Sequence, residues 1–126
     1  QVGTGLAITG TTIAIAGISV SSNQYCSARY AASVSVNWNN GNVQAITLSN
    51  DSNSITLSNP VAGGRYLLEL KQPASGAAGT VTWPASVKWS GGTAPTLTAT
   101  NGQTDLVALF YNGTNYAATA ALDFAL

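Results

Sequence analysis

The sequence predicts an all-β protein, an antiparallel β-sandwich or jelly-roll-like module with short strands and turns rich in Asn and Gly. Apolar and small polar residues alternate with period two along most of the chain, which is typical of half-buried strands. Clusters of Asn, Gly, Ser and Pro interrupt this alternation at short intervals. No window carries the i, i+3, i+4, i+7 apolar stripe of an amphipathic helix. Short strands between such turns indicate a sandwich or a barrel.

Each predicted strand rests on alternating apolar positions. In chain order these are Leu6 and Ile8; Ile13 and Ile15; Val34, Val36 and Trp38; Ile46 and Leu48; and Ile55 and Leu57. The alanine-rich residues 117–121 have helix propensity, but they lie between Tyr116 and Leu122-Asp123-Phe124. We therefore predict a strand there as well.

The turns between these strands predict hairpins. Residues 39–42 contain Asn40-Gly41, and Asn-Gly is the strongest short hairpin signal. The sequence Ile-Thr-Leu-Ser-Asn occurs at residues 46–50 and again at 55–59, on either side of one polar turn. We interpret the two copies as the arms of a single hairpin. A parallel β-helix is an alternative, which the uneven turn spacing disfavours.

The chain divides into residues 1–22, an N-terminal strand extension, and residues 23–126, the β-sandwich domain. Residues 1–22 contain no charged and no aromatic side chain. They form either a strand pair of the domain or an extension that pairs, through Leu6, Ile8, Ile13 and Ile15, with a neighbouring subunit. The chain opens on Gln1 rather than Met, so we expect a processed chain or a piece of a longer one, and an extracellular or virion location.

The charge content excludes several kinds of partner. Only 6% of the 126 residues are charged, against about 25% in typical domains, and the net charge is zero. Four basic residues cannot form the basic stripe that nucleic acid requires, or bind an anionic membrane surface. No apolar run has the length of a membrane span. The lack of net charge also removes the self-repulsion that keeps subunits apart, which favours self-association.

Catalytic machinery is not evident in the sequence. The chain contains no histidine and one cysteine, Cys26, so His-based triads and zinc sites are absent. The four acidic residues are Asp51, Glu69, Asp105 and Asp123, and their spacing suggests no paired site; we expect them on the surface or in turns. We therefore predict no enzyme activity, no metal and no cofactor.

Aromatic side chains are the remaining candidates for a site. The candidates for a subunit interface or a glycan contact are Trp38, Trp83, Trp89, Tyr111 and Tyr116. Packing in the core or between subunits is the favoured interpretation, because Trp and Tyr are enriched in interfaces. Stacking on sugar rings is the alternative, and it predicts a carbohydrate-binding module.

Residues 42–124 contain stretches that resemble modules of tailed-bacteriophage tail-fibre and minor structural proteins. The motifs that carry this resemblance are Gly91-Gly92-Thr93-Ala94-Pro95 and Tyr111-Asn112-Gly113-Thr114-Asn115-Tyr116, together with residues 59–72. The resemblance implies a β-rich module of a homo-oligomeric, often trimeric, virion fibre near a receptor-binding end. We therefore expect a structural subunit that assembles with copies of itself, as a trimer or a filament, and that contacts a host surface glycan. A pilus-like filament joined by donated strands is the alternative.

Overall fold

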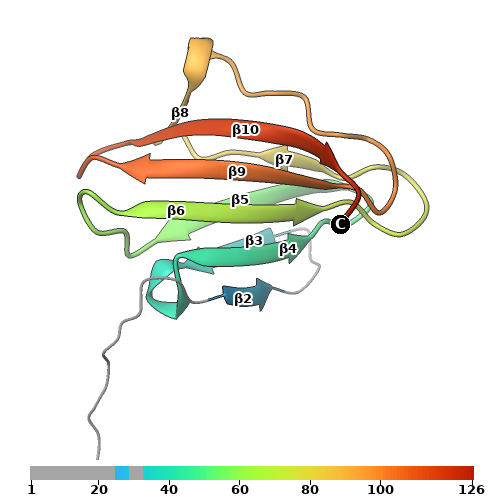
Figure 1. Ribbon diagram of the computed structural model, residues 1–126, viewed down its shortest axis with the longest axis horizontal. Coiled ribbons are helices and arrows are strands. Elements are labelled where there is room, and N and C mark those ends of the chain that lie inside the picture. Colours follow the sequence, from blue (N-terminus) through green and yellow to red (C-terminus); the bar gives the residue numbers. More distant parts are fainter. Residues whose placement is uncertain (1–24, 29–32) are drawn as a thin grey trace, which may run out of the picture.

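A computed structural model describes residues 25–28 and 33–126 of the chain, and these form two facing β-sheets (Figure 1). The six-stranded sheet has the order β2-β4-β6-β9-β10-β8, and the three-stranded sheet has the order β3-β5-β7. The strands are β2 (Tyr25–Ala28), β3 (Ser33–Asn37), β4 (Val43–Thr47), β5 (Ser52–Ser58), β6 (Arg65–Lys71), β7 (Thr80–Thr82), β8 (Val87–Trp89), β9 (Thr104–Tyr111) and β10 (Tyr116–Phe124). Two short 3-10 turns, η2 (Trp38–Asn40) and η3 (Ser90–Gly92), complete the elements.

The first six described strands form a parallel coil. Successive strands alternate between the two sheets, so each strand pairs in parallel with the strand two places further along the chain. The coil widens as it proceeds: Tyr25 lies opposite Val43, 18 residues on, whereas Ser52 lies opposite Thr80, 28 residues on. This connectivity is that of a β-solenoid, in which each coil contacts only its neighbours.

The C-terminal part of the chain ends the coil. β9 pairs antiparallel with β6 and with β10, and the connection between β9 and β10 is a hairpin around Asn112 to Asn115. β8 then pairs in parallel with the outer edge of β10. The large sheet therefore extends three strands beyond β6, whereas the small sheet ends at β7.

One apolar core fills the space between the sheets. Strand alternation determines its composition: in β3, the buried Val34 and Val36 alternate with exposed serines. Ile46 of β4 and Leu68 of β6 meet Ile55 of β5 in the same cluster. Both sheets therefore contribute their inward faces to one core, as in a sandwich.

The all-β prediction is confirmed, and so is the strand at residues 117–121, which lies within β10. The antiparallel prediction holds for β6–β9 and β9–β10, whereas the other five described pairings are parallel. The proposed hairpin between residues 46–50 and 55–59 is wrong, because β4 and β5 belong to different sheets. The hairpin predicted at residues 39–42 is also wrong, because this turn leads from β3 in the small sheet to β4 in the large one. The uneven spacing of the turns disfavoured a parallel β-helix, but the structure contains a solenoid-like parallel coil.

Candidate functional site

Three of the five candidate aromatic residues pack at one end of the core, around Tyr66, which the sequence analysis missed. Trp38 stacks on Tyr66 with ring centroids 4.3 Å apart, and Tyr116 lies edge-on to Tyr66 at 6.4 Å. The indole Nε1 of Trp38 donates a hydrogen bond of 3.0 Å to the Tyr116 hydroxyl. Tyr111 is half-buried against Tyr116 at 4.8 Å. Trp38 and Tyr116 are therefore core residues, and their ring faces are not available to a ligand.

The other two candidates form a second pair. Trp83 and Trp89 lie edge to face with centroids 5.1 Å apart, and both are half-buried beside the core. Trp83 follows β7 and Trp89 ends β8, so the pair joins the two sheets on the side where the small sheet ends.

Buried amide side chains hold three corners of the coil. Gln44 donates to the carbonyl oxygens of Asn37 and Gly41 at 2.8 and 3.0 Å. Asn53 donates to the carbonyls of Asp51 and Thr80, at 2.8 and 3.1 Å. Where the chain turns, some backbone groups lose their partners in the strand ladders. Buried backbone groups need hydrogen-bond partners, and these amides provide them.

The third amide, Gln72, connects Gly79, which directly precedes β7, to the crossing segment of residues 94–99. Its Oε1 accepts from the backbone N–H of Gly79 at 2.8 Å, and its Nε2 donates to the carbonyls of Gly79 and Thr98 at 3.0 and 2.7 Å. Asp105 holds the same crossing segment from the other side, since its Oδ2 accepts from the Thr98 N–H at 2.7 Å. Asp105 is buried, contrary to the expected surface position.

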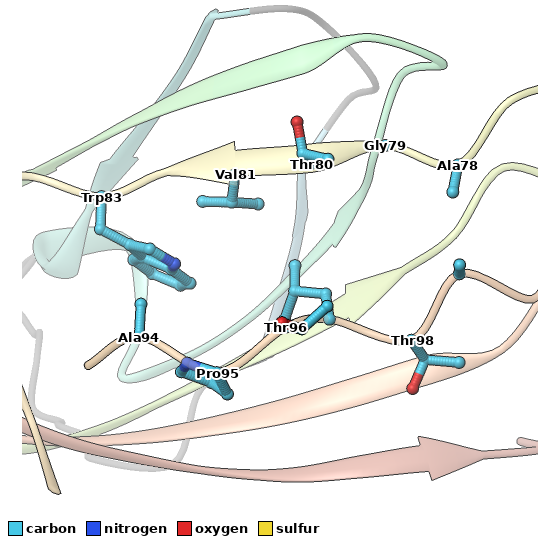
Figure 2. A pocket seen from close by; sticks show the side chains of 11 residues that line it. Ala78, Gly79, Thr80, Val81, Trp83, Ala94, Pro95, Thr96 and Thr98 are labelled. Carbon is cyan, nitrogen blue, oxygen red and sulfur yellow. The ribbon is translucent and has the colours of Figure 1, made fainter. Parts of the chain in front are cut away.

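A groove of about 250 Å³ lies between β7 and residues 94–99 (Figure 2). In Figure 2 the two walls run side by side, with Trp83 beside Ala94 at one end, and Ala78 on one wall and Thr98 on the other at the opposite end. The Gln72 amide joins both walls at the Thr98 end. The lining is composed of small and apolar residues: Ala78, Gly79, Thr80, Val81, Trp83, Ala94, Pro95, Thr96, Leu97, Thr98 and Ala99.

The groove follows an open strand edge. β7 pairs with β5 on one side, and among the described strands it has no partner on the other side. β3, at the opposite end of the small sheet, also has a single described partner strand. Neither strand contains a charged residue or a proline. These are the residues by which natural proteins normally prevent edge-to-edge pairing.

A second hollow, of about 290 Å³, lies at the β9–β10 hairpin. Phe110 is 44% exposed there, beside Lys88 and the amides of Asn112 and Asn115. The Asn112 Oδ1 accepts from the backbone N–H groups of Thr114 and Asn115, which fixes the turn. Phe110 therefore lines this hollow together with polar side chains, and the buried Tyr116 is the one sequence candidate among its lining residues.

Several predictions lie outside the described residues or find no counterpart among them. Leu6, Ile8, Ile13 and Ile15 belong to residues 1–24, which the structure does not describe. Within the described ranges, no three side chains of His, Cys, Asp or Glu gather as metal ligands. No helix in those ranges has the length and apolar character of a membrane crossing. No protein-family model, curated protein or solved structure matched the chain.

Proposed function

We propose that this protein is a structural subunit of a self-assembling extracellular or virion fibre. The observation that carries the proposal is the pair of strand edges, β3 and β7, at opposite ends of the small sheet, each with a single partner strand in the described part of the chain and without a charged residue or a proline. An exposed strand edge without charge or proline is a template for another chain. Edges at opposite ends of one molecule favour a head-to-tail contact, and such contacts generate filaments or closed rings.

The composition supports the same proposal. With four basic and four acidic side chains, little electrostatic repulsion opposes the approach of a second copy. The outward faces of the edge strands carry serine and threonine, which can pack closely and hydrogen-bond across a contact. The resemblance of residues 42–124 to tailed-phage fibre modules favours a virion fibre, and a trimer is then the closed form of the assembly.

The direct test is the mass and shape of the purified chain, measured by multi-angle light scattering with electron micrographs of the same sample. We expect filaments or a stable oligomer. Thr82→Lys places a charge on the β7 edge and should reduce assembly about tenfold. Ala108→Lys is the matched control, because Ala108 is exposed on β9 and is paired on both sides, with β6 and with β10. A chain that stays monomeric at every concentration would overturn the proposal.

A carbohydrate-binding module is the second candidate, and the hollow at the β9–β10 hairpin is the observation that favours it. Aromatic faces beside amide groups suit a sugar ring, and Phe110 with Asn112 and Asn115 provides both. The test is binding to a glycan array, with Phe110→Ser as the variant. Binding that Phe110→Ser abolishes would assign host-surface attachment to this end of the subunit.

A further inference from the structure

We propose that the groove between β7 and residues 94–99 accepts the N-terminal segment of a second copy, as an extended strand centred on Ile13 and Ile15. This inference rests on the proposed function, since it names the contact by which the subunits assemble. Such a contact is β-strand addition, in which backbone hydrogen bonds supply affinity and alternate side chains supply specificity.

The groove occupies the place of a missing strand. The large sheet continues through β9, β10 and β8, whereas the small sheet, which faces it, ends at β7. Residues 94–99 cross this region without joining the small sheet, and the groove separates them from β7. The backbone groups on the outer side of β7 therefore face the groove, where an added strand would pair with them.

The walls of the groove are fixed in position. Gln72 bonds to both walls, at Gly79 and Thr98, and it is buried. Asp105 holds Thr98 from the large sheet, and Trp83 packs on Trp89 at the other end. Because the walls are held by side chains from other elements, the groove is preorganised and an entering strand need not order it.

The lining selects an occupant of small and branched apolar residues. Thr80 and Thr82 are exposed and Val81 is half-buried, so an added strand should direct its larger side chains inward beside Val81. Residues 12–16 read Thr-Ile-Ala-Ile-Ala, which places two β-branched side chains on one face and small residues on the other. Leu6 and Ile8 also alternate, but Gly5 directly precedes Leu6 and shortens that strand, whereas the glycine-free run of residues 11–16 surrounds Ile13 and Ile15.

The first described strand and the groove lie at opposite ends of the coil, which favours a second copy as the donor of the strand. The described chain begins at Tyr25 in β2, the outermost strand at one end of the large sheet. The groove lies beyond β7, at the opposite end of the coil. Ile15 lies ten residues before Tyr25, a reach of roughly 33 Å in extended chain. In a head-to-tail stack, the segment that precedes β2 of one copy therefore meets the groove of the next.

Disulfide trapping in the full chain tests this contact. In a Cys26→Ser background, Ala14→Cys is combined with Thr82→Cys or, for a second register, with Thr80→Cys. These positions lie on the outward face of the proposed strand pair, where cross-strand cysteines can bridge. We expect more than half of the protein in a ladder of dimers and larger species on a non-reducing gel. Ala14→Cys with Ala108→Cys, an exposed position on β9 that is paired on both sides, is the control, and it should give no such ladder.

A charge variant tests the same face without cysteine. Ile13→Asp with Ile15→Asp should lower the assembled fraction at least tenfold, whereas Thr12→Asp with Ala14→Asp, on the opposite face, should lower it by less than threefold. Both variants should keep the near-ultraviolet circular dichroism of the wild type, which reports the packed aromatic cluster.

The outcomes separate this inference from the proposed function. If the wild type assembles but the ladder is absent and the aspartate pairs behave alike, the donated strand is wrong and the fibre proposal stands. If a faster-migrating, internally bridged monomer replaces the ladder, the segment fills the groove of its own chain and the second copy is excluded. If the wild type is monomeric and the cysteine pairs form no ladder, both proposals are wrong.

Discussion

Replacing Asn53 with alanine should destabilise the protein more than any change at an exposed asparagine. Asn53 is fully buried at the corner between β4 and β5. Its Oδ1 accepts from the Ser49 backbone N–H at 3.0 Å, and its Nδ2 donates to the carbonyls of Asp51 and Thr80 at 2.8 and 3.1 Å. The substitution therefore removes three well-formed hydrogen bonds to the backbone and leaves their partners inside the corner.

The size of the effect follows from these bonds. Each lost bond costs about 1 kcal/mol of stability, so the free energy of unfolding should fall by roughly 3 kcal/mol. For a domain of this length, that loss corresponds to a decrease in Tm of roughly 12 °C. Asn53→Asp should cost at least as much, because a carboxylate keeps the acceptor but cannot donate to the two carbonyls, and it places a charge in the core.

Urea unfolding followed by tryptophan fluorescence measures the loss, at one fixed protein concentration because association shifts apparent stability. Asn40→Ala is the matched control, since Asn40 is exposed in η2, and it should change the free energy of unfolding by less than about 0.5 kcal/mol. If Asn53→Ala unfolds within about 1 kcal/mol of the wild type, the amide does not hold the corner, and our account of how the coil turns is wrong.

Three further predictions concern the core. Burial raises the pKa of the Tyr116 phenol above its ordinary value near 10, so wild-type stability should fall as the pH rises from 10 through that higher pKa. Tyr116→Phe should remove this contribution to the alkaline loss, and it should cost about 1–3 kcal/mol at neutral pH because the Trp38 N–H loses its acceptor; urea titrations at pH 7 and pH 11 compare the two chains. Asp105→Asn should cost roughly 1–3 kcal/mol by the same assay, because an amide cannot accept at both oxygen positions, and an unchanged midpoint would contradict this. Leu68→Ala should cost about 2–5 kcal/mol in thermal unfolding, since Leu68 is fully buried where the sheets meet, and a smaller loss would mean that the core collapses around the cavity.

The alternation of residues correctly predicted strands β3, β4 and β5 and their inward faces. Val34 and Val36 point inward as the pattern requires, and so do Ile46 and Ile55. The same alternation contains no information about which strand is the partner. A short polar connection can fold the chain back as a hairpin or lead it across the core to the other sheet, and the sequence 46–59 satisfies both.

A signal that separates these two outcomes was nevertheless present. Asn53 and Gln44 occupy inward positions of the alternation in β5 and β4, and the buried Gln72 continues the inward phase of β6 directly after that strand ends. A polar residue in that phase must bond to nearby backbone, which is what a corner supplies and a solvated hairpin turn does not. The groove, by contrast, could not be predicted, because it arises from the unequal widths of the two sheets.

The connectivity of the strands also sets the order in which the chain can fold. The β9–β10 hairpin is the most local of the described pairings in the large sheet, so we expect it to form early. The parallel pairings β2–β4 and β4–β6 join residues 18 and 24 apart, whereas the β6–β9 pairing joins residues 33 to 45 apart. We therefore expect the parallel coil and the C-terminal hairpin to form separately, and the β6–β9 pairing that joins them to form last.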